Sequence, residues 1–259
     1  MSVAGPVFLI SPDGMLGQAW SALLTRDGVQ HVGASFPALD LTSAASLDAI
    51  DFSAFSVVVN CSGYTDVDGA ESNEAQATAV NGHGVGALAK RCAAAGAVLV
   101  HYSTDYVFDG QGEVPYSVEH PRAPLNAYGR SKAVGEVLIE AAGDAHLIVR
   151  TSWLYAPWGN NFVRTMARLG RQRDSLRVVD DQYGRPTSAE HLAAVTMALL
   201  DHDVRGIAHV TDGGQCTWHG LAQAVIAAVN PDCRVERCST AEFPRPATRP
   251  PYSVLDLSA

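Results

Sequence analysis

The first half of the chain alternates between short apolar runs and longer segments of helical periodicity. Apolar runs at 7–10, 31–34, 56–60, 98–102 and 147–150 predict strands, and the segments at 14–24, 43–53, 74–95 and 128–142 predict helices. Continuous apolar strands separated by helices are typical of a parallel sheet that is buried on both faces. Because crossovers between parallel strands are right-handed, helices are expected on both sides of the sheet. The pattern therefore predicts an α/β fold with a Rossmann-like, doubly wound parallel sheet.

The pattern loosens after residue 150. Residues 153–185 are rich in glycine, asparagine and aromatic side chains, whereas helical periodicity returns at 188–200 and 218–229 and a strand-like run lies at 207–210. We expect residues 1–150 to form the sheet domain, with elements around 188–212 returning to it. Residues 151–259 are expected to form a smaller C-terminal, substrate-binding domain.

Composition and charge narrow the class of protein. The chain has 259 residues, of which 47% are hydrophobic, and this is a globular composition. Its net charge of −9 disfavours nucleic acid or an anionic membrane as a partner. The five cysteines form no CxxC pair and no zinc-ligand spacing, so we expect reduced thiols, no metal site and a cytoplasmic location. The apolar run at 7–10 is too short for a signal peptide or a membrane span.

The turn after the first predicted strand resembles a phosphate-binding loop. Residues 11–17 read Ser-Pro-Asp-Gly-Met-Leu-Gly and lead into a predicted helix. Glycine lets the backbone approach a pyrophosphate, and the helix N-terminus offers free N–H groups. Ser11 stands where the first glycine of a GxxGxxG pattern is expected, and a purely structural turn would use the same glycines. Residues 34 and 35 are neither acidic nor Arg, which favours NADPH over NADH only weakly.

The strongest chemical signal is the spacing of Tyr128 and Lys132. Residues four apart on a helix share one face, so phenol and ammonium are expected to lie together. An ammonium ~4 Å from a phenolate at an effective dielectric of ~20 lowers the pKa of the phenol by roughly three units, towards neutrality. A phenol of this kind can donate and recover a proton. A solvated helix face is the alternative interpretation of the same spacing.

Other polar residues follow the predicted strands at the same edge of the sheet, where open parallel sheets bind ligands. Thr104 offers a hydroxyl beside Tyr128, and Asp105 is either a substrate ligand or a turn former. Trp153 presents a flat face for a sugar or a base, with core packing as the alternative. Asn161 is a further candidate for contact with a diphosphate, from its spacing alone.

With these motifs assembled, the sequence resembles the extended short-chain dehydrogenase/reductase superfamily and, within it, the dTDP-4-dehydrorhamnose reductase family. The matching stretches are 60–72 (NCSGYTDVDGAES), 101–110 (HYSTDYVFDG), 124–136 (PLNAYGRSKAVGE), 150–155 (RTSWLY), 159–166 (GNNFVRTM) and 179–187 (VDDQYGRPT). They occur in the family's order over nearly the whole chain. The resemblance implies NADPH- or NADH-dependent reduction of the 4-keto group of dTDP-4-dehydro-β-L-rhamnose to dTDP-β-L-rhamnose.

The resemblance also implies roles for individual residues. Thr104, Tyr128 and Lys132 form the implied catalytic set. The expected cofactor-binding residues are Ser11, Gly14, Met15, Leu16, Asp40, Leu41, Ser62, Gly63, Tyr64, Thr65, Tyr102, Tyr128 and Lys132. The expected substrate-binding residues are Thr104, Asp105, Tyr128, Trp153 and Asn161. On this basis, residues 1–150 form an NAD(P)-binding domain and residues 151–259 a nucleotide-sugar-binding domain.

Two alternatives stay open from the sequence. One is a 4-ketoreductase for another dTDP-deoxysugar, with the same catalytic residues and a different pocket. The other is a non-catalytic regulatory homologue, which the intact Thr104, Tyr128 and Lys132 disfavour. Some family members dimerise through metal-bound carboxylates, but Met15 stands at one such position, although Glu190 matches another. We therefore expect the chain to be a monomer or a weak homodimer. Its expected binding partner is a small molecule, the dTDP-sugar substrate.

Overall fold

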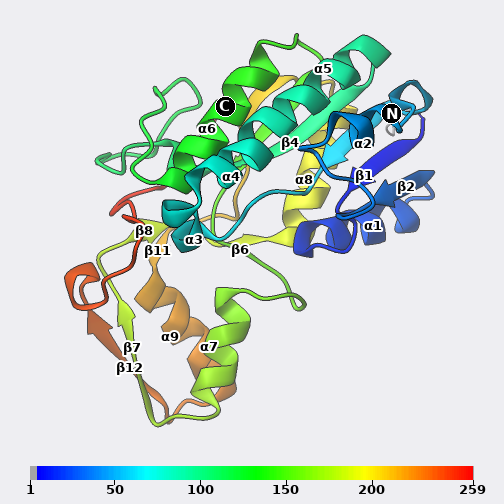
Figure 1. Cartoon of the computed structure of the whole chain (residues 1–259). Helices are drawn as coiled ribbons and strands as arrows, with labels where there is room; N and C mark the ends of the chain where they lie inside the picture. Colours follow the sequence, from blue (N-terminus) through cyan, green and yellow to red (C-terminus); the bar gives the residue numbers. More distant parts are fainter. Residues whose placement is uncertain (1–4, 259) are drawn as a thin grey trace.

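The computed structural model describes residues 5–258 and is built around a six-stranded sheet (Figure 1). The strand order is β10-β5-β4-β3-β1-β2, and every neighbouring pair is parallel. The strands are β1 (Val7–Ile10), β2 (His31–Ala34), β3 (Val57–Asn60), β4 (Val98–Thr104), β5 (His146–Thr151) and β10 (Gly206–His209). The chain leaves β1 for β2 on one side and returns to β3 on the other, so the strand order reverses at β1. The predicted doubly wound sheet is confirmed.

Helices cover both faces of the sheet because side chains of each strand alternate between them. Leu9 and Val59 belong to the core under α1 (Met15–Arg26) and α8 (Ala189–Asp201). Phe8 and Val58 belong to the opposite core. That second core is covered by α2 (Ala44–Asp48), α5 (Val85–Ala95) and α6 (Ala127–Glu140), which lie together on one side of the sheet (Figure 1).

The helix predicted at 74–95 is divided into α4 (Glu74–Thr78), a π-helical turn (Ala79–Gly84) and α5, and α3 (Val67–Ser72) precedes it. The buried side chain of Asn81 lies in the π turn and binds the backbone of Tyr64 twice: Tyr64 N donates to Oδ1 at 2.8 Å, and Nδ2 donates to Tyr64 O at 3.0 Å. A wider turn is a common device at functional sites. Here it ties the loop after β3 to α6, since Asn81 also donates to Ser131.

Two further predicted boundaries differ in detail. The helix expected at 43–53 is α2 followed by a separate 3₁₀ turn (Phe52–Ala54). At the N-terminus of α2 the side chain of Ser43 accepts a hydrogen bond from Ser46 N. Asp51 caps the second turn in the same way. The periodicity predicts one helix over these residues, but the caps at Ser43 and Asp51 each begin a separate helical turn.

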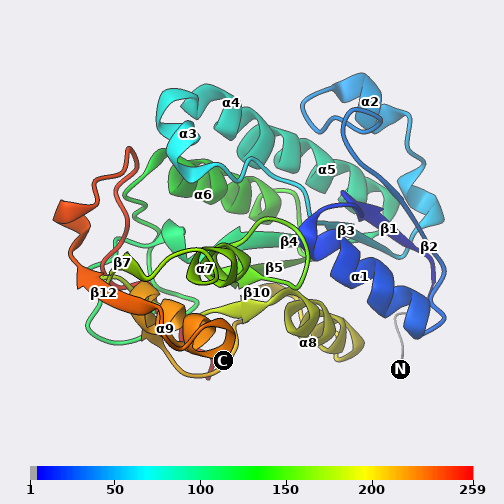
Figure 2. The same cartoon turned by 90° about the horizontal axis from the view of Figure 1, so that it is seen from below.

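The C-terminal half contributes both to the sheet and to a separate lobe. Within residues 188–212, β10 pairs with β5 and α8 packs against α1. The lobe contains α7 (Phe162–Gly170) and α9 (Trp218–Val229) packed on a parallel pair of strands, β7 (Ser175–Val179) and β12 (Arg234–Cys238), around a core of their own (Figure 2). Two small pairs join the parts: β6 (Leu154–Tyr155) with β9 (Thr187–Ser188), and β8 (Tyr183–Gly184) with β11 (Cys216–Thr217).

Three further observations concern residues 5–258. No helix in this range has the length and apolarity required to cross a bilayer. No group of three His, Cys, Asp or Glu side chains within it is arranged to hold a metal ion. The five cysteines are all free thiols.

Candidate active site

A cavity of about 790 Å³ lies at the carboxyl ends of β1, β3, β4 and β5. This is the edge at which doubly wound sheets bind ligands. The lobe closes the cavity from the opposite side through residues near α7 and α9. Its lining consists of Ser11, Asp13, Gly14, Met15, Leu16, Cys61, Ser62, Gly63, Thr65, Val67, Tyr102, Ser103, Thr104, Asp105, Tyr106, Tyr128, Lys132, Thr151, Ser152, Trp153, Leu154, Gly159, Asn160 and Trp218.

The turn between β1 and α1 has the backbone shape of a phosphate-binding loop despite the missing first glycine. Ser11 adopts φ of +60°, a left-handed conformation that glycine normally supplies. A side chain on Gly17 would bring its Cβ to 1.9 Å from the carbonyl oxygen of Ser11, so only glycine fits there. Gly14 is the N-cap residue of α1 and no side chain caps that helix, so the first-turn N–H groups of Met15 and Leu16 have no side-chain partner beside the cavity. The loop therefore fits the pyrophosphate of a dinucleotide.

Tyr128 and Lys132 lie on α6 and both line the cavity, as their spacing predicts. Asn126 caps α6: its Oδ1 accepts a hydrogen bond from Gly129 N at 2.8 Å, which places Tyr128 in the first turn. Lys132 Nζ donates to the carbonyl oxygen of Tyr102 at 2.6 Å. The amine is thus held against β4.

The expected lowering of the Tyr128 pKa is absent from this structure. Burial and the neighbouring Asp105 carboxyl raise the pKa of Tyr128 above its ordinary value, and the Thr104 hydroxyl opposes them. Lys132, whose Nζ lies against Tyr102 O, is not among the groups that lower the pKa of Tyr128 here. Tyr128 is therefore a fully protonated phenol, which is the form that a proton donor requires.

Thr104 and Asp105 form a buried hydrogen-bonded unit at the end of β4. Thr104 Oγ1 accepts from Tyr106 N at 3.1 Å and donates to Asp105 Oδ1 at 3.0 Å. Burial raises the pKa of Asp105 to about 7, against the opposing effect of hydrogen bonds from Ser253 and Thr104. Near neutral pH this carboxyl is therefore able to accept or donate a hydrogen bond in the cavity.

Trp153 lines the cavity as half of a stacked aromatic pair. Its ring and that of Trp218 are parallel to within 12°, with centroids 3.6 Å apart. Trp153 has a φ of +47°, which is unusual for a bulky residue. The ring packs directly on Gly184 in β8, where any Cβ would lie 2.6 Å from the indole carbons. Glycine at 184 is thus required for this position of Trp153.

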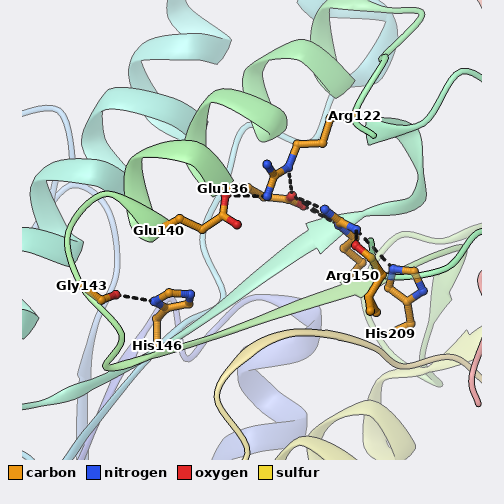
Figure 3. A network of polar contacts seen from close by, with 8 residues as sticks. Arg122, Glu136, Glu140, Gly143, His146, Arg150 and His209 are labelled. Carbon is orange, nitrogen blue, oxygen red and sulfur yellow. Dashed lines mark hydrogen bonds and ion pairs between the residues drawn. The ribbon is translucent and has the colours of Figure 1, made fainter. Parts of the chain in front are cut away.

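A buried ion pair supports α6 one turn beyond Lys132 (Figure 3). Glu136 is fully buried and receives bonds from Arg150 Nη2 at 2.7 Å and Arg122 Nε at 2.5 Å. Arg150 lies on β5 and is 1% exposed, and its guanidinium also covers the ring of Phe108. The pair joins α6 to the sheet.

The structure brings most of the predicted residues to one cavity. Those that line it are Ser11, Gly14, Met15, Leu16, Ser62, Gly63, Thr65, Tyr102, Thr104, Asp105, Tyr128, Lys132 and Trp153. Four predicted residues lie outside its lining: Asp40, Leu41, Tyr64 and Asn161.

The four outliers have structural tasks of their own. Leu41 is buried in the core, and Asp40 accepts hydrogen bonds from Thr42 in a turn. Tyr64 is anchored by Asn81. Asn161 caps α7 by accepting from Arg164 N at 3.0 Å, and its amide nitrogen donates to the Ala156 carbonyl at 2.9 Å. Both ends of the Asn161 side chain are therefore engaged, and its neighbour Asn160 lines the cavity instead.

The sequence-based reasoning missed Trp218, the second aromatic face of the cavity. Trp218 lies 65 positions beyond Trp153 and begins α9. An aromatic residue in an amphipathic helix normally indicates core packing, so the pattern gave no signal for a ligand site. Trp218 reaches the cavity lining only because the tertiary structure stacks its ring on that of Trp153.

The chain is similar to proteins of known family over most of its length. The family model for the RmlD substrate binding domain matches residues 7–259. A dTDP-4-dehydrorhamnose reductase from Streptomyces griseus is 44% identical over 253 residues, covering 95% of this chain and 83% of that protein. A dTDP-4-keto-6-deoxy-D-glucose reductase from Streptomyces niveus is 39% identical over 249 residues, covering 95% and 86%.

A solved structure agrees with this result. The crystal structure of dTDP-4-dehydrorhamnose reductase from Bacillus anthracis in complex with NADP superposes with a TM-score of 0.95 at 34% identity, covering 98% of this chain and 91% of that one. The resemblance found in the sequence motifs is confirmed. With a family model spanning nearly its whole length and relatives above 40% identity, the chain belongs to the dTDP-4-dehydrorhamnose reductase family.

Proposed function

We propose that this chain uses NADPH, or NADH, to reduce the 4-keto group of dTDP-4-dehydro-β-L-rhamnose and so forms dTDP-β-L-rhamnose. The observation that supports this most is the convergence of Thr104, Tyr128 and Lys132 on one cavity beside an uncapped helix N-terminus. A hydroxyl, a protonated phenol and an amine are the groups that carbonyl reduction requires at such a position. The family membership supports the same assignment.

The cofactor would be held by the residues around the first turn and the loop after β3. Met15 and Leu16, in the first turn of α1, offer backbone N–H groups for a pyrophosphate, whereas Gly14 N donates to the Ser11 carbonyl oxygen at 3.1 Å. Gly63 lies close against Asn81, since a Cβ there would lie 3.0 Å from Asn81 Oδ1, so a side chain would crowd this part of the loop after β3. When bound, the reduced nicotinamide supplies the hydride that the carbonyl carbon accepts.

The protein's own part in the reaction is to position the ketone and deliver a proton. Thr104 Oγ1 is placed to hydrogen-bond the carbonyl oxygen once a ligand displaces its contact with Asp105. Tyr128 gives its proton to the oxygen as the C–O double bond becomes a single bond. A charged Lys132 would stabilise the phenolate left behind, and the stacked Trp153 and Trp218 would form an aromatic wall of the cavity beside the nucleotide-sugar.

The direct test is NADPH oxidation by the purified chain, followed by absorbance. We expect oxidation with dTDP-4-dehydro-β-L-rhamnose and a product identified by NMR as dTDP-β-L-rhamnose. Oxidation that is faster with dTDP-4-keto-6-deoxy-D-glucose would favour the second candidate, a ketoreductase for another dTDP-deoxysugar, to which the Streptomyces niveus relative points. No oxidation with any keto-sugar nucleotide would favour a regulatory homologue and overturn the proposal.

Replacing Gly184 by alanine should weaken substrate binding. Its Cβ would lie 2.6 Å from the Trp153 ring, so that the ring must shift and the stack on Trp218 is disturbed. Loss of about 0.5–1.5 kcal/mol of aromatic contact corresponds to a KM for the keto-sugar roughly 3- to 10-fold higher, with a smaller change in kcat. Gly213→Ala is the matched control, because nothing lies within 4 Å of a Cβ at that position. Equal KM values for the two variants would contradict the role of Gly184.

We also propose that the enzyme is cytoplasmic and acts on a small dTDP-sugar. Its proposed oligomeric state is a monomer or a weak homodimer. Five free thiols in a chain of this size are typical of a reducing compartment. Sedimentation across a range of concentrations tests the oligomeric state, and a tight dimer at low concentration would contradict it.

A further inference from the structure

The buried side chain of His101 connects two polar residues beside the cavity. His101 Nδ1 lies 3.1 Å from Nδ2 of Asn60, at the end of β3. Its Nε2 lies 3.3 Å from Nζ of Lys132. Asn60 and His101 are fully buried and Lys132 is 5% exposed, so solvent does not satisfy these groups. The mechanism above uses neither Asn60 nor His101.

The orientation of Asn60 decides which nitrogen of His101 carries the proton. Oδ1 of Asn60 accepts from Ser62 N at 3.0 Å and from Ser62 Oγ at 2.6 Å. Because a backbone N–H only donates, Oδ1 must face Ser62 and the amide nitrogen must face His101. Nδ1 of the ring is then the acceptor, so a neutral ring carries its proton on Nε2.

That tautomer directs an N–H at Lys132. An ammonium has three donors and no acceptor, so a charged Lys132 would oppose one donor to another across 3.3 Å. A neutral amine has a lone pair that accepts the Nε2–H, while one of its own N–H groups donates to Tyr102 O at 2.6 Å. Among the protonation states of this chain of contacts, only the one with a neutral amine leaves no donor facing a donor.

We propose that Asn60 and His101 are positioning residues that hold Lys132 as a neutral amine in the cofactor-free protein. They act through Lys132 and so control the charge that would stabilise a Tyr128 phenolate. The role of that charge rests on the proposed function, whereas the protonation state rests on the contacts alone.

The surroundings of Lys132 both lower and raise the pKa of its amine. Burial lowers the pKa of Lys132 to about 8, and Glu136, one turn along α6, opposes this. Burial holds the pKa of His101 well below its ordinary value, which keeps the ring neutral. Tyr128 on α6 and Asp105 after β4 line the same cavity.

The chain's composition makes the protonation state directly measurable. It contains two lysines, Lys90 and Lys132, and Lys90 is exposed. Carbon-13 labelling of lysine Cε therefore yields two resonances, which Lys90→Arg assigns. In the cofactor-free protein the Nε2–H of His101 should lower the Lys132 midpoint further than burial does, to below about pH 7, so that the amine is neutral at neutral pH. A Lys132 midpoint above about pH 7 would overturn the inference.

Asn60→Asp tests the role of the tautomer, because the change is isosteric. A carboxylate facing Nδ1 draws the ring proton to that nitrogen and leaves Nε2 as an acceptor for an ammonium. We expect the midpoint of the Lys132 titration to rise by about one unit or more. Nitrogen-15 spectra of histidine should show His101 changing from the Nε2–H to the Nδ1–H form. An unmoved Lys132 midpoint in the folded variant would contradict the proposal.

The wild-type protein keeps the test open if that variant does not fold. Nitrogen-15 labelling reports the tautomer of His101 directly, with His101→Gln to assign its signal among the nine histidines. An Nδ1–H ring in the cofactor-free wild type would overturn the inference. These measurements need no turnover, so an absence of NADPH oxidation would count against the proposed function and leave the Lys132 state unaffected.

Discussion

Tyr128→Phe is expected to lower kcat about 10²- to 10⁴-fold, the range by which a positioned proton donor accelerates a reaction. The variant loses only a hydroxyl that lines the cavity, and the ring keeps its contacts with the buried residues around it. Since the proton is needed in the transition state and not in the bound ketone, kcat and kcat/KM should fall together while KM stays within a few-fold. Stopped-flow or steady-state NADPH oxidation measures both constants.

A second phenol in the same cavity provides the matched control. Tyr106 also lines the cavity, and its ring meets that of Tyr128 edge to face at 6.2 Å. Tyr106 is not one helical turn from Lys132, so Tyr106→Phe should cost less than about tenfold in kcat, well below the range of a lost proton donor. Similar losses in both variants would show that Tyr128 is not the specific donor, and undiminished turnover of Tyr128→Phe would remove it from the mechanism.

Glu136→Ala is expected to lower the free energy of unfolding by about 3–5 kcal/mol, the cost of leaving a buried partner charge unpaired. Arg150, 1% exposed, would keep its bond to the Val118 carbonyl but lose its three hydrogen bonds to the Glu136 carboxylate. Glu136→Gln keeps the shape and one acceptor, so its loss should be smaller. Urea unfolding of the three proteins compares the free energies.

An exposed ion pair provides the reference for this measurement. Asp48 bonds Arg91 at 2.7 Å but its side chain is 65% exposed, so Asp48→Ala should cost under about 1 kcal/mol. A loss of the same size in Glu136→Ala would contradict the stabilising role of the buried pair.

The pH dependence of the Glu136 contribution has a definite sign. Burial alone would raise the pKa of Glu136, but its bonds to Arg150 and Arg122 hold it below the ordinary value. A carboxyl with a lowered folded pKa stabilises the protein above its unfolded pKa of ~4.3, and that stabilisation is lost as pH falls through the folded value. Wild type and Glu136→Ala should therefore converge in stability at acidic pH.

The protonation of Lys132 and the buried charge on Glu136 both depend on contacts that periodicity does not report. Asn60, His101 and Lys132 are 31 to 72 positions apart along the chain, and their order on β3, β4 and α6 alone decides that they meet. The expectation that Lys132 lowers the pKa of Tyr128 used their spacing on one helix. It was wrong for this structure, because spacing places two groups on a face without stating what else binds them.

Local sequence determined the alternation of strands and helices, and with it the parallel sheet and the edge at which Thr104, Tyr128 and Lys132 gather. The apolar runs of strands and the periodicity of helices involve residues a few positions apart, so a single sequence is enough to predict them. The tertiary structure decided the rest: the π turn that seats Asn81, the Trp153 and Trp218 stack over Gly184, and the protonation of the buried polar groups. Burial and partner geometry set those properties, and both arise only when distant segments pack together.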